Sequence, residues 1–181
     1  MKLYRYLDCE NLEIIQNKIY DYLKDVEKVL DKKTYAGLPT TQIIDDIPEL
    51  KSFLENLNLG AFMVGVHILY QSGTIHLEHP ILRGPRIIFP IKNGEKSQTN
   101  IYECTNLKQE IRNNNNGFAY VHISYDEYKV IDSYVATKPV LFYPIEPHQI
   151  VVPDGPLEHP RIMLILFLEG VQPYRLIEEA N

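Results

Sequence analysis

Three residues of types that bind metals lie at spacings that could bring them together. His76 and Glu78 are two residues apart in the segment Ile75-His76-Leu77-Glu78, and residues two apart on a strand point to the same face. An imidazole nitrogen and a carboxylate oxygen on one face can therefore bind the same cation. His148 begins a strand-like apolar run after the turn-like residues 144–147, which makes it a candidate third ligand. The sequence predicts a metal site formed by His76, Glu78 and His148.

Two histidines and one carboxylate on one face of a metal leave other coordination positions open. This arrangement is typical of non-haem iron(II) oxygenases, whose open positions hold a cosubstrate and O₂ together. His79 is the rival to His76, but it lies three residues further on and faces away if the strand continues, and Pro80 is expected to end that strand. Of the remaining histidines, we expect His67 and His122 to contribute to packing and His159 to lie at the surface.

Two arginines precede apolar runs, where a buried guanidinium would need an anionic partner. Arg161 precedes the run 162–168, and Arg86 precedes the run 87–91. A guanidinium fits a carboxylate through two parallel hydrogen bonds, so either arginine could bind an anionic small molecule. For either one considered alone, a solvated strand end is the better explanation.

The helices and strands that must position these residues can be predicted from the spacing of apolar residues, which changes along the chain. Residues 8–58 are expected to be helical, with a first helix capped by Asp8, a loop over 32–45, and a second helix from Pro48 to a stop at Gly60. The apolar face of the first helix comprises Leu12, Ile15, Ile19, Leu23, Val26 and Leu30. From residue 61 onward, apolar residues recur with a period of two, which predicts strands. The predicted strands are 61–70, 74–78, 86–91, 99–104, 119–124, 140–143, 149–152 and 161–168. Short strands separated by turn signals favour a β-sandwich or jelly roll.

These motifs together resemble the 2-oxoglutarate/Fe(II)-dependent oxygenase superfamily, and they are most similar to small members related to the aspartyl/asparaginyl β-hydroxylases. The resemblance rests on 75–78, 86–91, 99–103, 138–142, 147–150 and 160–162. It covers 61–169, and 48–59 resembles the helix before the core strands in those small members, whereas 1–45 has no recognisable signature. It implies a mainly β fold with N-terminal helices and a double-stranded β-helix (jelly-roll, cupin-like) core. We expect a single domain over 1–181, with a helical segment (1–59), the core (60–170) and a tail (171–181).

The resemblance also implies the chemistry of the site. His76, Glu78 and His148 would bind Fe(II), and 2-oxoglutarate and O₂ would be used to hydroxylate an unidentified protein side chain or small molecule. Arg161 matches the residue that pairs with the distal carboxylate of 2-oxoglutarate, and Arg86 lies where β-hydroxylases have a second arginine for this cosubstrate. Substrate selection is expected from loops around Gly37, 81–85 and 113–116.

The sequence departs from the family pattern at several positions. Most members have HxD where this chain has HxE, and the β-hydroxylases lack a carboxylate ligand, so the role of Glu78 stays open. The segment between His148 and Arg161 is longer than usual, and Ile88 is apolar where small relatives often have a polar residue. Two alternatives therefore remain: a cupin-like metal protein that does not use 2-oxoglutarate, and a non-catalytic jelly roll with a structural or interaction role.

Composition excludes some classes of function. The net charge is −6 and there is no Lys/Arg-rich run, which argues against a general nucleic-acid binder. The longest apolar stretches are too short to span a bilayer, and the N-terminus does not resemble a signal peptide. The two cysteines, Cys9 and Cys104, do not make a disulfide framework. We therefore expect a cytoplasmic protein with a small-molecule cosubstrate and no membrane partner.

Overall fold

The described part of the chain folds into a mainly β structure with three α-helices and a short 3-10 helix. The computed structural model describes residues 2–25, 35–38, 41–80, 83–113 and 119–168. Its helices are α1 (Leu12–Asp25), α2 (Gln42–Asp46), α3 (Pro48–Asn56) and the short 3-10 helix η2 (Gly94–Lys96). Its strands are β1 (Tyr4–Tyr6), β2 (Tyr35–Gly37), β3 (Ala61–Leu69), β4 (Arg86–Lys92), β5 (Gln98–Cys104), β6 (Lys108–Asn113), β7 (Ala119–Ser124), β8 (Tyr128–Tyr134), β9 (Val140–Phe142), β10 (His148–Val151) and β11 (Arg161–Leu168).

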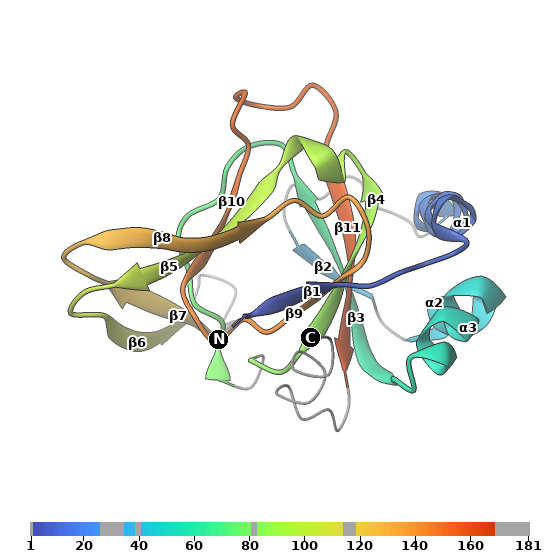
Figure 1. Cartoon of the computed structure of the whole chain (residues 1–181), viewed down its shortest axis with the longest axis horizontal. Coiled ribbons are helices and arrows are strands. Elements are labelled where there is room, and N and C mark those ends of the chain that lie inside the picture. The colour runs from blue at the N-terminus through green and yellow to red at the C-terminus, as the bar shows by residue number, and fades with distance from the viewer. Residues whose placement is uncertain (1, 26–34, 39–40, 81–82, 114–118, 169–181) are drawn as a thin grey trace.

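The strands form three antiparallel sheets. The largest has six strands in the order β1-β9-β4-β11-β3-β2, and the others are β10-β5-β8 and β6-β7. Figure 1 shows the helices on one side of the six-stranded sheet and the two smaller sheets on the other side. The six-stranded sheet therefore forms the middle layer.

Strand β11, in the middle layer, is buried on both of its faces. Each of its eight residues is buried. Ile162, Leu164, Leu166 and Leu168 belong to the apolar cluster that includes the helical residues, whereas Met163, Ile165 and Phe167 pack in the cluster that contains Ile101 of β5 and Tyr134 of β8. Since strand side chains alternate between faces, Arg161 points to the same side as Met163, into the space between the sheets.

The segment 74–78, predicted to be a strand, is reduced to two isolated bridges. His76 pairs with His148 of β10, and Leu77 pairs with Val121 of β7, both antiparallel. The segment therefore links the three-stranded sheet to the two-stranded sheet. It brings His76 and His148, which are far apart in the sequence, directly opposite one another.

Several predictions for the N-terminal part were wrong in detail. Helix α1 begins at Leu12, and the Asp8 carboxylate instead accepts a hydrogen bond from Lys138 Nζ at 2.7 Å. The expected loop over 32–45 contains strand β2, which includes Gly37, and part of helix α2. Val26, Leu30 and residues 81–82, 114–118 and 171–181 lie outside the described residues, so the predictions made for them stay untested.

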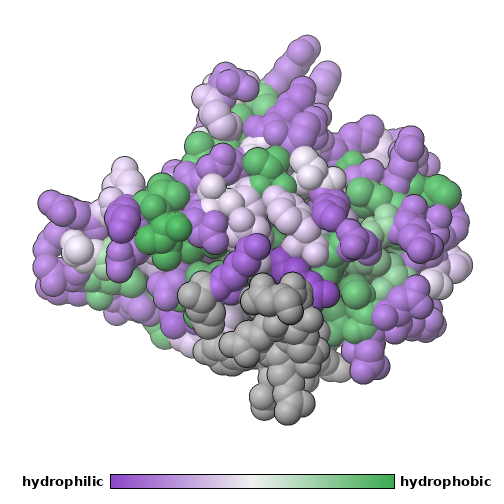
Figure 2. All heavy atoms as spheres, in the orientation of Figure 1, coloured by the Kyte–Doolittle hydropathy of each residue, from purple (hydrophilic) through white to green (hydrophobic). Residues whose placement is uncertain are grey.

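The surface is predominantly hydrophilic on the face seen in Figure 2, and apolar residues gather there over β8 and along the border between the six-stranded sheet and the helices. In β8, Val130 and Ile131 are about half exposed, at 46% and 47%. Among the described residues, no helix has the length and apolar character needed to cross a membrane.

We expect Gly94→Ala to destabilise the fold, because Gly94 has no room for a side chain. A Cβ at this position would clash with the carbonyl oxygen of Ala136 and lie 3.0 Å from Met163 Cε and 3.1 Å from Pro90 Cβ. Overpacking of this kind costs about 1–3 kcal/mol of unfolding free energy. Gly60→Ala is the matched control, because a Cβ at Gly60 meets nothing within 4 Å. Equal urea midpoints for the two variants would contradict the prediction.

Candidate metal centre

The two histidines of the predicted site are neighbours because their backbones pair. The amide N of His76 donates to the carbonyl O of His148, and the amide N of His148 donates to the carbonyl O of His76, each at 2.9 Å. Residues that exchange both hydrogen bonds in an antiparallel pair have side chains on the same face. The two imidazole rings accordingly lie with their centroids 4.3 Å apart. Long-range pairing thus accounts for this part of the site.

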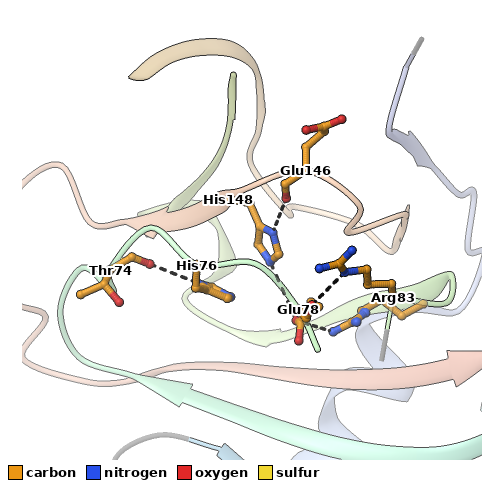
Figure 3. A network of polar contacts seen from close by, with 7 residues as sticks. Thr74, His76, Glu78, Arg83, Glu146 and His148 are labelled. Atoms are coloured by element: carbon orange, nitrogen blue, oxygen red, sulfur yellow. Dashed lines mark hydrogen bonds and ion pairs between the residues drawn. The ribbon is translucent and has the colours of Figure 1, made fainter. Parts of the chain in front are cut away.

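Glu78 completes a group that could hold a metal ion. It lies two residues after His76, and its Oε1 is 3.9 Å from Nε2 of His148 (Figure 3). One ligand atom from each of His76, Glu78 and His148 lies within 4.8 Å of the others. Ligands about 2.1 Å from one ion stand roughly 3 Å apart at right angles, so small side-chain rotations suffice to bind a metal. A donor set of two histidines and one carboxylate is compatible with Fe(II).

Both histidines present the same ring nitrogen to this group. Nδ1–H of His76 donates to the carbonyl O of Thr74, and Nδ1–H of His148 donates to the carbonyl O of Glu146, each at 3.0 Å (Figure 3). Because a carbonyl can only accept, these bonds fix the tautomer and leave Nε2 available as a ligand, as is usual for metal-binding histidines. Burial, followed by the proximity of His76, lowers the pKa of His148 well below its ordinary value. His148 is therefore a neutral imidazole, the form that binds metals.

Two arginines hold Glu78. Nη1 of Arg86 donates to Glu78 Oε1 at 2.8 Å, and the side chains are 5% and 20% exposed. Nε of Arg83 donates to the backbone O of Glu78 at 2.9 Å, and its Nη2 reaches Gln109 Oε1 of β6 at 2.7 Å. The carboxylate and the backbone of this residue are thus restrained from different elements (Figure 3).

We call His76, Glu78 and His148 the metal-binding group, after the ion that they could hold. This group lines a cavity of about 270 Å³ between the six-stranded and three-stranded sheets. Phe142, Ile150, Met163 and Ile165 are among the residues that give it apolar walls. Apolar walls lower the local dielectric constant and so strengthen the electrostatic interactions within the cavity.

Arg161 lines the same cavity, and its cation has no ion-pair partner among the described residues. It is 2% exposed, and its Nε and Nη1 atoms are buried without a hydrogen-bond partner among the described residues. Burial lowers its pKa to about 10, so it remains charged at neutral pH, and the neighbouring Tyr134 only partly offsets this effect. Burying a charge without a partner is costly. An anion that enters the cavity could therefore pair with Arg161.

His67 also lines the cavity, although its sequence context predicted only a packing role. It lies on β3 opposite Met163, which is the inward face of the sheet. Burial lowers its pKa to about 3, and the positive charge of Arg161 and the proximity of His76 add to this effect. The signal was present in the period-two pattern, which placed His67 on the face opposite Val66 and Ile68. The sequence did not say which face would line a cavity.

The low pKa of His67 predicts acid sensitivity. The unfolded chain binds a proton at His67 below about pH 6.5, whereas the folded protein does so only near pH 3, so acidification favours unfolding. Between pH 7 and pH 5 this should remove up to about 2 kcal/mol of unfolding free energy. The His67→Asn variant should lose correspondingly less over that interval in urea unfolding. Equal losses for the variant and the wild type would contradict the assignment.

The structure resolves the ranking of the other histidines. Among the described residues, the group that could hold a metal contains His76 and not its rival His79, and it excludes His122 and His159. His159 is exposed, as predicted. No protein-family model matches this chain, and no curated protein matches it at a significant level. The features of this chain that bear on its function are therefore the metal-binding group and Arg161.

Proposed function

We propose that this chain is an iron(II)- and 2-oxoglutarate-dependent oxygenase with a double-stranded β-helix core, acting as a hydroxylase. The observation that carries the proposal is that Arg161, a buried cation without an ion-pair partner among the described residues, shares a cavity with His76, Glu78 and His148. A metal site alone would suit many proteins. A metal site that shares an apolar cavity with a guanidinium suits a ligand that chelates a metal at one end and carries a carboxylate at the other.

The sheet arrangement supports the proposed core. Antiparallel sheets pack face to face, and the metal-binding residues project from the smaller side of this pair toward the six-stranded sheet. Strands β10 and β5, together with the bridged segment 76–78, supply that side. This is the arrangement expected of a double-stranded β-helix, with a metal held between its two walls.

The residues of the cavity divide the binding of 2-oxoglutarate between them. Arg161 would donate hydrogen bonds to the distal carboxylate in a charge-assisted pair that satisfies its buried donors. Burial raises the pKa of Tyr134 to about 12, so its phenol keeps the proton that it can donate to the same carboxylate. His76, Glu78 and His148 would hold iron(II), which when bound supplies O₂ activation coupled to oxidation of the cosubstrate. The apolar walls would keep water from this reaction.

The proposal is tested by calorimetric titration of the Mn(II)-loaded protein with three ligands. 2-Oxoglutarate should bind at least about tenfold more tightly than 2-oxovalerate, which lacks the distal carboxylate, or glutarate, which lacks the chelating oxo group; a tenfold difference corresponds to about 1.4 kcal/mol. Removal of the metal should weaken the binding of 2-oxoglutarate. Equal affinity for 2-oxoglutarate and 2-oxovalerate would leave Arg161 without the proposed role and would favour a cupin-like metal protein. Failure to bind any metal would favour a non-catalytic jelly roll.

A further inference from the structure

Glu78 lies in a segment that pairs only briefly with neighbouring strands. Residues 76 and 77 make isolated bridges, and Glu78 itself is outside any strand. Glutamate also has one more rotatable bond than aspartate, so its carboxylate can occupy more positions around a metal. A ligand on such a segment needs restraint from elsewhere to hold the geometry that a metal requires.

Arg86 comes from a strand that is paired on both sides. It begins β4, which lies between β9 and β11 in the middle of the six-stranded sheet, and its backbone pairs with Phe142 and Phe167. Its guanidinium carbon stands 4.7 Å from the centroid of the Phe167 ring, and its side chain is 5% exposed. Packing therefore fixes the guanidinium before any ligand binds.

The hydrogen bond from this fixed guanidinium ends on the carboxylate oxygen that faces His148. Oε1 of Glu78 accepts from Arg86 Nη1 at 2.8 Å and is the oxygen 3.9 Å from His148 Nε2. Hydrogen bonds to a ligating carboxylate orient it and tune its basicity. Arg83 fixes the backbone of the same residue through its carbonyl O. Glu78 is thereby directed toward the two histidines.

We propose that Arg86 is a positioning residue that holds the Glu78 carboxylate as a metal ligand and does not contact the cosubstrate. The inference rests on the metal site of the proposed function. It gives Arg86 a role different from the cosubstrate contact that the family resemblance implies. It also explains how a glutamate can serve here, because a fixed guanidinium removes the freedom that the additional methylene introduces.

The proposal is tested by a double-mutant cycle with Co(II), whose visible absorption reports ligand number. Arg86→Met should lower Co(II) affinity about 10- to 100-fold, the usual effect of removing a partner of a ligand. Glu78→Gln should also lower it, and the double variant should bind Co(II) no more weakly than Glu78→Gln. The cobalt spectrum of Arg86→Met should shift toward that of Glu78→Gln. Arg86→Lys should recover part of the lost affinity, because an ammonium group can donate one of these hydrogen bonds.

The controls separate this inference from the proposed function. Arg112→Met removes a matched arginine–glutamate pair at the surface, with side chains 45% and 62% exposed, and should leave Co(II) affinity unchanged. Cobalt-saturated Arg86→Met should bind 2-oxoglutarate within about threefold of wild type, which is under 1 kcal/mol. If Arg86→Met bound Co(II) normally but bound 2-oxoglutarate weakly, Arg86 would be a contact of the cosubstrate, and the inference would fail while the proposed function stood. Losses of Co(II) affinity that add in the double variant would overturn the inference in the same way. If wild type bound Co(II) but not 2-oxoglutarate, the proposed function would fail while the role of Arg86 stood.

Should Arg86→Met fail to fold, the cycle is run with Arg86→Lys. Its deficit in Co(II) affinity should then vanish in the Glu78→Gln background. A deficit of equal size in both backgrounds would overturn the proposal.

Discussion

Replacing Arg161 with methionine is expected to weaken the binding of 2-oxoglutarate roughly 30- to 5,000-fold and to leave the affinity for divalent metals unchanged. Truncating one partner of a buried, hydrogen-bonded charge pair costs about 2–5 kcal/mol, which corresponds to roughly 30- to 5,000-fold in affinity. His76 and Glu78 lie in the segment between β3 and β4, and His148 lies on β10, so none of them is on the strand of Arg161 and the group should bind Mn(II) as before. Calorimetric titration with the metal and then with 2-oxoglutarate measures both affinities.

The same substitution should stabilise the ligand-free protein. Arg161 is buried, and two of its donor atoms have no partner in the part of the chain that the structure describes. Replacing buried charged residues with apolar side chains of similar size commonly adds about 1–4 kcal/mol to the unfolding free energy. A gain in stability with a loss of ligand binding is the signature of a residue retained for function. Arg112→Met, at an exposed ion pair, should change neither property. Wild-type affinity for 2-oxoglutarate in Arg161→Met would contradict the assignment.

Replacing His148 with alanine should have the largest effect on metal binding. His148 is buried, neutral, and offers Nε2 to the site while its Nδ1–H bonds to Glu146. Because losing only a partner of a ligand costs about 10- to 100-fold in metal affinity, losing a ligand should cost more than about 100-fold. Competition titration with a chromogenic chelator measures the change.

His159→Ala is the matched control for this prediction, because His159 is exposed and lies outside the metal-binding group. It should bind Mn(II) as tightly as wild type. His148→Gln, which preserves more of the buried volume, guards against an effect of misfolding. If folded His148→Ala and His148→Gln retained wild-type affinity, the metal site would have to lie elsewhere.

The strands that were predicted from the sequence are those whose apolar side chains are buried in the core. Apolar runs with a period of two marked β3, β4, β5, β7, β9, β10 and β11 to within a few residues. Strands β6 and β8 were missed because their residues are largely polar or exposed, so burial leaves no pattern in them. The three-residue strands β1 and β2 are too short to show a period, and they exist because an edge of the large sheet pairs with them.

The part of the site that depends on local spacing in the sequence was predictable. HxE placed His76 and Glu78 on one face, and the structure brings both to His148. The direct pairing of His76 with His148 depends on contacts between distant segments, and the sequence has no local signal for it. The pairing of Arg86 with Glu78 and the inward position of His67 were likewise missed, because each depends on which strand faces the cavity.

The central claim is that one cavity binds iron(II) and 2-oxoglutarate together. The most direct measurement is anaerobic titration of the apoprotein with Fe(II) and then 2-oxoglutarate, followed by visible spectroscopy. We predict a weak charge-transfer band that requires both additions, disappears in His148→Ala, and requires far more 2-oxoglutarate in Arg161→Met. A folded, iron-saturated wild-type protein that gives no band with 2-oxoglutarate would contradict the account.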